Sequence, residues 1–119
     1  SGDVRDLEEA AEKGHTGADL ALNAFVASIR HYVGGYMAAL GGADVVVFTG
    51  GIGENSRRVR EGVLSRMEWA GIRLDGERNR SAKEEARIAR DDSPVDVWVV
   101  PTNEELVVAR QAAELVANR

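Results

Sequence analysis

Hydrophobic residues recur along this chain with two different spacings, which predict helices and strands. Between residues 18 and 40 the larger apolar residues are three or four positions apart, so they lie on one face of a long helix. The runs 43–49 and 95–100 are instead continuously apolar, which is typical of strands covered on both faces in a parallel sheet. The remaining pattern predicts shorter helices over 3–13, 55–69 and 104–117.

Glycines and polar residues mark the predicted ends of these elements. Thr16 or Gly17 is suited to cap the start of the long helix. A glycine pair inside that helix, Gly34–Gly35, is costly for helix stability, so it indicates close packing against another element. The charged stretch 75–92 predicts a helical or irregular excursion. Helix ends are predicted at Gly14, Gly41–Gly42 and Gly71.

The predicted order is helix, strand, helix, strand, helix. A right-handed crossover between the two strands would place them parallel in one sheet. A sheet of only two strands is marginal by itself, and both strands are apolar enough to need neighbours. The pattern therefore predicts part of an α/β domain whose other strands come from elsewhere.

Composition narrows the classes of function. A length of 119 residues suits one small domain, and a net charge of −5 argues against nucleic acid or anionic membranes as partners. Ten basic residues between 57 and 90 alternate with nine acidic residues between 54 and 92, which predicts a mixed solvated surface. The lack of cysteine excludes disulfides and thiolate sites and fits a reducing compartment. We see no apolar run long enough to cross a bilayer and no signal-peptide pattern.

The most informative stretch follows the first predicted strand. The apolar run Val45–Phe48 stops at Gly50, Gly51 and Gly53, and a helix is expected to begin at Glu54. Glycines allow positive φ and close approach of a ligand to the backbone, and a helix start offers unpaired N–H groups. The turn therefore suits the adenosine or phosphate part of a nucleotide. A plain strand-to-helix connection without a ligand remains an equal alternative at this point.

Four motifs along the chain resemble the acetate and propionate kinase family, and acetate kinase in particular. They are Asp3-Val4-Arg5, Phe48-Thr49-Gly50-Gly51-Ile52-Gly53-Glu54-Asn55, Glu77-Arg78-Asn79 and Pro101-Thr102-Asn103-Glu104-Glu105-Leu106. The resemblance covers essentially all of the chain, but it corresponds to only about the last third of a family member.

The resemblance implies an α/β fold: the C-terminal half of an actin-like (ribonuclease H-like) ATPase domain, with parallel strands covered by helices and an incomplete sheet. Residues 1–119 would form the C-terminal nucleotide-binding part of the second domain. By the resemblance, Asp3, Val4 and Arg5 would contact the nucleotide on one side. The adenosine loop on the other side would consist of Gly50, Gly51, Ile52, Gly53 and Glu54, with Asn55 as an accessory. Glu104 would be the carboxylate linked to Mg²⁺.

The implied reaction transfers the γ-phosphoryl group of ATP to acetate, reversibly giving acetyl phosphate and ADP. A propionate or butyrate kinase, or a non-catalytic nucleotide-binding or structural piece, remains an alternative. The family's catalytic residues and acyl-phosphate pocket lie in the absent N-terminal two-thirds, so no catalytic residue is expected here and the isolated chain should be inactive. We also expect a cytoplasmic parent protein that is a homodimer, with no nucleic-acid or membrane partner.

Simpler roles stay open for several of these residues. Glu104 could be an acidic residue that complements the dipole of a helix start. Arg5 could form a surface ion pair with Asp3, Asp6 or Glu9. His15 and His31 match no family motif, and we interpret both as structural or exposed.

Overall fold

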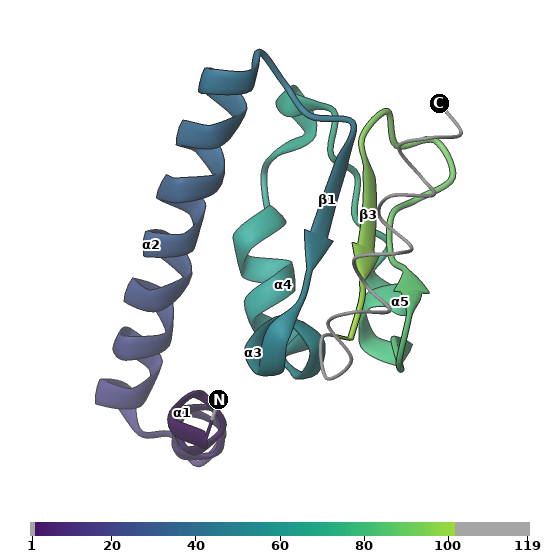
Figure 1. Ribbon diagram of the computed structural model, residues 1–119. Coiled ribbons are helices and arrows are strands. Elements are labelled where there is room, and N and C mark those ends of the chain that lie inside the picture. Colours follow the sequence, from purple (N-terminus) through teal and green to yellow (C-terminus); the bar gives the residue numbers. More distant parts are fainter. Residues whose placement is uncertain (1, 102–119) are drawn as a thin grey trace.

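The computed structural model describes residues 2–101, so the predicted C-terminal helix lies outside the described residues. In Figure 1 the long helix α2 lies alongside α4, which separates it from strand β1, while α1 crosses near one end of α2. The elements are α1 (Gly2–Glu12), α2 (Thr16–Leu40), β1 (Val45–Phe48), α3 (Gly50–Asn55), α4 (Arg57–Leu64), the 3-10 helix η1 (Glu68–Ala70), α5 (Gly76–Ser81), β2 (Ala86–Arg87) and β3 (Asp96–Val99).

The long helix α2 forms as predicted, but its start is capped by a different residue. His15 is the N-cap, and its Nδ1 accepts a hydrogen bond of 3.1 Å from the backbone N–H of Ala18. Thr16 and Gly17 already belong to the helix, so the predicted cap was wrong by one or two positions. At the other end Gly41 adopts φ of 74°, the left-handed conformation expected of a glycine that ends a helix.

The two predicted strands pair in parallel, as expected. Val45 on β1 is opposite Asp96 on β3, and Phe48 is opposite Val99. A third strand, β2, pairs antiparallel with β3, so the described sheet has the order β1-β3-β2 and is mixed. This strand lies in the charged stretch 75–92, which does not alternate strongly enough in hydrophobicity to predict it. The same stretch also contains helix α5.

Coverage of the sheet differs between its strands. On β3, Val97 and Val99 are buried in the core. On β1, Val46 and Phe48 are half-buried, but Val45 and Val47 are 39% and 50% exposed. Among the described residues β1 is therefore covered less completely than β3. An α/β architecture with an incomplete sheet is confirmed.

The core lies between the sheet and helices α2 and α4. The helix predicted over 55–69 is divided, because Ser56 interrupts it before α4 and the segment after Leu64 leaves the helical path. Close contact between α2 and α4 depends on Gly62, where an added Cβ would lie 2.9 Å from Cγ1 of Val26. Gly34 and Gly35 have nothing within 4 Å of an added Cβ, so the close packing predicted for them does not occur among the described residues.

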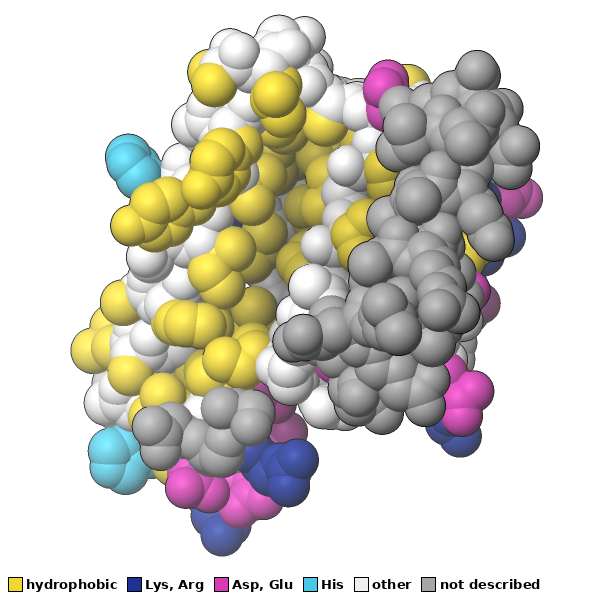
Figure 2. Space-filling view, viewed as in Figure 1, with side chains coloured by type: hydrophobic (Ala, Val, Ile, Leu, Met, Phe, Trp, Pro, Cys, Tyr) yellow, Lys and Arg dark blue, Asp and Glu magenta, His cyan; other side chains and the backbone are white. Residues whose placement is uncertain are grey.

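Several large hydrophobic side chains remain exposed on one side of the molecule. Tyr32, Tyr36 and Leu40 follow each other at intervals of one turn on α2 and are 63–75% exposed. Figure 2 shows hydrophobic side chains gathered over α2 and over the region between α2 and the sheet. We call Tyr32, Tyr36, Leu40, Val45 and Val47 the exposed apolar set. No helix among residues 2–101 has the length and hydrophobicity needed to span a membrane.

The basic and acidic residues between 54 and 92 largely form the solvated, mixed surface that their alternation predicts. Exposed ion pairs there join Arg73 to Asp92 and Arg78 to Asp91, at 2.9 and 3.0 Å. Arg60 is the exception, because it is only 2% exposed. The expectation of a solvated surface was wrong at this position.

Candidate functional site

The glycine-rich segment is a short helix and not an open loop. Helix α3 begins at Gly50, immediately after the N-cap Thr49, whereas the sequence predicted a helix start at Glu54. Gly50 has φ of 79°, which an L residue rarely adopts, and it allows the chain to turn sharply from β1 into α3. The requirement for glycine at this turn is therefore confirmed for Gly50.

Gly53 is required for a different reason. A Cβ at Gly53 would lie 3.3 Å from the backbone carbonyl carbon of Phe48 and 3.4 Å from its Cβ. Helix α3 thus folds back tightly against the end of β1, and Gly53 permits packing within the chain. This contact alone accounts for a glycine at position 53, and the role of Gly53 in ligand approach stays a prediction.

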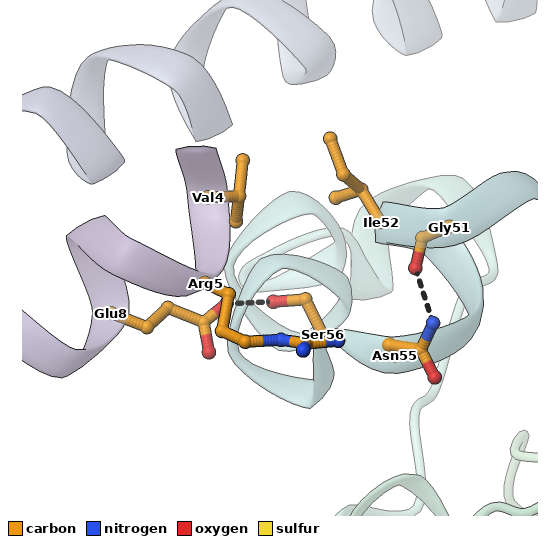
Figure 3. A pocket seen from close by; sticks show the side chains of 7 residues that line it. All are labelled: Val4, Arg5, Glu8, Gly51, Ile52, Asn55 and Ser56. Carbon is orange, nitrogen blue, oxygen red and sulfur yellow. Dashed lines mark hydrogen bonds between the residues drawn. The ribbon is translucent and has the colours of Figure 1, made fainter. Parts of the chain in front are cut away.

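A cavity brings together two segments that the resemblance assigned separately to nucleotide binding. It lies between α1 and the α3–α4 junction, as Figure 3 shows. Of the predicted residues, Val4 and Arg5 line it from one side and Gly51, Ile52 and Asn55 from the other. Glu8 and Ser56 complete the lining, and neither was predicted from the sequence.

Hydrogen bonds fix most of this lining. The Nδ2 of Asn55 donates to the carbonyl oxygen of Gly51 over 2.9 Å, and the Oγ of Ser56 donates to Oε1 of Glu8. The same Ser56 Oγ accepts from the N–H of Val59 at 3.1 Å and so caps α4. Ser56 therefore links the start of α4 to α1.

Arg5 brings a positive charge to the cavity. Figure 3 shows its side chain extending from α1 towards Ser56 and Asn55. The alternative of a surface ion pair with Asp6 or Glu9 is not seen among the ion pairs of the described residues. Arg5 is thus part of the cavity lining and offers it a cationic group, while an ion pair with Asp3 lies outside the described residues.

The cavity is small for a complete nucleotide. Its volume is about 50 Å³, whereas ligand sites in proteins are commonly about 300–1,000 Å³. The cavity of the described residues is therefore large enough for only a part of such a ligand. They bring a cation, an amide and backbone groups to the cavity, which suit binding and orientation of a ligand.

The other predicted residues either do not line this cavity or lie outside the described residues, and Val4 has a second role in the core. Gly50, Gly53 and Glu54 belong to α3 but do not line this cavity. Val4 is only 8% exposed and also belongs to the hydrophobic core. Glu104 lies outside the described residues, as does the side chain of Asp3. In residues 2–101 no group of three or more His, Asp or Glu side chains is arranged to hold a metal ion.

A buried polar network behind the cavity was missed by the sequence reasoning. Arg60 and Asn79 are 2% and 0% exposed, and the Nε of Arg60 donates to Oδ1 of Asn79 at 2.7 Å. Burial lowers the pKa of the Arg60 guanidinium, which nevertheless stays charged because arginine titrates so far above neutrality. Charge alternation gave no signal for it, and only helical spacing did, since Arg60 lies three and four residues before the apolar Val63 and Leu64, both of which are buried.

Comparison with known proteins agrees with the motifs. The model of the acetokinase family matches residues 1–110. The chain is 54% identical over 115 residues to acetate kinase of Finegoldia magna, and 47% identical over 116 residues to acetate kinase of Methanosarcina thermophila. These matches cover 97% and 98% of this chain, but the chain spans only 29% and 28% of the length of those relatives.

Solved structures show the same likeness. Acetate kinase of Porphyromonas gingivalis superposes with a TM-score of 0.83 at 42% identity, covering 98% of this chain and 29% of that protein. A propionate kinase of Francisella tularensis gives a TM-score of 0.75 at 33% identity, covering 89% of this chain and 27% of that protein. The family model, the relatives and the arrangement of the motifs thus lead to one assignment: the chain belongs to the acetokinase family.

Proposed function

We propose that this chain is the C-terminal nucleotide-binding part of an acetate kinase. The complete enzyme would transfer the γ-phosphoryl group between ATP and acetate, with acetyl phosphate and ADP as products. The observation that carries this proposal is the shared cavity of α1 and α3. It joins Arg5 to Gly51 and Asn55, which belong to two separate family motifs.

The proposed contribution of this chain is to bind and orient the nucleotide. Phosphoryl transfer depends mainly on positioning and on stabilising the charge of the phosphates. Gly51 and Ile52 would lie against the adenosine, where the absence of a side chain on Gly51 leaves room for it. Arg5 would bind the ribose or a phosphate oxygen through its guanidinium. The reacting groups would come from the rest of the enzyme.

The rest of the enzyme would also complete the fold. Within the described residues β1 pairs only with β3, and Val45 and Val47 are exposed. We propose that the longer part of the polypeptide adds strands beside β1. The exposed apolar set would be covered by that part or by a second subunit of a homodimer. A cytoplasmic location is proposed with the same family assignment.

Magnesium enters the proposal through Glu104. Mg²⁺ takes oxygen ligands and keeps several of its waters, so a single carboxylate can serve directly or through water. The described residues offer no ligand set for this ion, and we assign them no step that involves it. When bound, the ion would neutralise charge on the phosphates.

Propionate is the second candidate for the phosphoryl acceptor. It is favoured by one observation, the structural similarity to the propionate kinase of Francisella tularensis. The two acceptors differ by one methylene group, and the pocket that would distinguish them lies outside this chain.

A valine at position 51 tests the proposed nucleotide site in the full-length protein. It adds an isopropyl group at a residue that lines a cavity of about 50 Å³. We expect Gly51→Val to raise the KM for ATP about ten-fold or more, because overpacking of a close-fitting site commonly costs 1–3 kcal/mol. The KM for acetate and the melting temperature should change little.

The same substitution on α2 provides a control. Gly34 has open space around it in the described part of the chain, so Gly34→Val should leave the KM for ATP unchanged. Equal affinities for ATP in the wild-type and Gly51→Val enzymes would overturn the assignment of this cavity to the nucleotide.

A further inference from the structure

Helix α3 is too short to be stable alone, so its position depends on tertiary contacts. It has six residues, whereas isolated helices in water need roughly 12–15 residues to be even marginally stable. Its last carbonyl groups also lack partners within the helix. What holds these carbonyl groups therefore decides where Gly51, Ile52 and Asn55 lie.

Arg60 donates directly to that end of α3. Its Nη1 lies 2.9 Å from the carbonyl oxygens of both Gly53 and Glu54. A buried cation at the C-terminal end of a helix also interacts favourably with the helix dipole. Because two carbonyl groups share one rigid guanidinium, both the distance and the direction of α3 relative to α4 are set.

Asn79 holds the guanidinium of Arg60 from the opposite side. The Nη2 of Arg60 donates to the carbonyl oxygen of Asn79 at 2.8 Å, in addition to the bond from Nε to Oδ1. The Nδ2 of Asn79 donates to the carbonyl oxygen of Arg57 at 3.0 Å, at the start of α4. Helix α5 is thereby joined to α4 and, through Arg60, to α3.

We infer that Arg60, held by Asn79, is a positioning residue that sets the geometry of the nucleotide site through backbone carbonyl groups. Neither side chain lines the cavity, so neither is expected to touch the nucleotide. This inference rests on the proposed function, because it takes the cavity between α1 and α3 to be the nucleotide site.

The test is Arg60→Lys in the full-length protein. Lysine keeps the charge but lacks the planar fork that reaches Gly53, Glu54 and Asn79 together. We expect the KM for ATP to rise about ten-fold, since hydrogen bonds from a charged group are among the stronger ones. The KM for acetate should change less than about two-fold.

Arg30→Lys is the matched control. Arg30 also donates to backbone carbonyl groups, those of Gly62, Val63 and Ser65 at the end of α4. None of these residues lines the cavity. We expect both Arg30→Lys and Arg60→Lys to lower the melting temperature, but only Arg60→Lys to change the KM for ATP.

The outcomes separate the inference from the proposed function. If Gly51→Val raises the KM for ATP but Arg60→Lys does not, the positioning role is wrong and the nucleotide site stands. If neither variant changes that KM, the nucleotide site itself is wrong. Equal increases in the KM for ATP and for acetate after Arg60→Lys would indicate general damage and overturn the positioning role.

Asn79→Ser serves if Arg60→Lys is insoluble. It leaves the guanidinium in place but removes the acceptor of its Nε, and we expect the same selective increase in the KM for ATP.

Discussion

The contact between α2 and α4 allows a quantitative prediction at Gly62. An added Cβ there would lie 2.9 Å from Cγ1 of Val26 and 3.3 Å from Cγ2. Real Cβ atoms essentially never approach another heavy atom as closely as the shorter of these distances. Val26 is branched and lies at the interface of the two helices, so the helices themselves must separate to relieve the contact.

Two opposing effects decide whether Gly62→Ala raises or lowers the free energy of unfolding. Alanine inside a helix is favoured over glycine by about 1 kcal/mol. Overpacking of a well-packed interface costs about 1–3 kcal/mol. We therefore expect Gly62→Ala to lower the free energy of unfolding by about 1 kcal/mol.

Gly34→Ala is the comparison, because it gains the same helix propensity but its added Cβ has no close contact like that between Gly62 and Val26. An added Cβ at Gly34 meets nothing within 4 Å, so this variant should be stabilised by about 1 kcal/mol. The two variants should thus differ by about 2 kcal/mol, measured by urea unfolding of the full-length protein. A stability of Gly62→Ala equal to or above that of Gly34→Ala would refute the packing argument.

Two further predictions concern single carboxylates. Desolvation alone would raise the pKa of Asp96, but hydrogen bonds from Trp98, Arg87 and the N–H of Val97 outweigh it and lower that pKa. The contribution of Asp96 to the free energy of unfolding should therefore be present near neutrality and be lost as the pH falls below about 4. Asp96→Asn should have a lower free energy of unfolding than the wild-type protein at pH 7, and it should lose less of that free energy in acid. In the full-length protein Glu104→Gln should depress turnover and raise the Mg²⁺ requirement with little change in melting temperature; unchanged activity with a loss of about 0.3–1 kcal/mol would instead identify Glu104 as an acid of the helix start.

The regular elements could be predicted because hydrophobic spacing determines them directly. The long helix and the parallel pair of strands follow from steps of three and four and from unbroken apolar runs. Strand β2 could not be predicted, because its two residues are too few to show a hydrophobic pattern and lie within a charged stretch. The division between α3 and α4 was missed for a related reason: Ser56 acts as an N-cap, although it looks like an ordinary polar position within a helix.

Residues of the candidate site could be predicted where they belong to a family motif. Residues that stabilise the site through tertiary packing could not. Arg5, Gly51 and Asn55 were expected from motifs, and the structure brings them to one cavity. Arg60 was assigned to a solvated surface, since charge alternation carries no information about which arginine is buried. Its burial depends on acceptors supplied by Asn79 and by the end of α3, which only the fold brings together.

Because α3 directly follows β1, the proposed nucleotide site would connect nucleotide binding to completion of the sheet. Phe48 ends β1 and packs directly against Gly53, so any shift of the strand is transmitted to α3. Arg60 holds the same part of α3 through the carbonyl oxygens of Gly53 and Glu54, and Asn79 joins this network to α5. The position of Gly51 and Asn55 thus depends both on β1, beside which we propose that the rest of the enzyme adds strands, and on this buried network. We therefore expect such pairing to order the proposed nucleotide site, and by linkage a bound nucleotide to favour that pairing to the same extent.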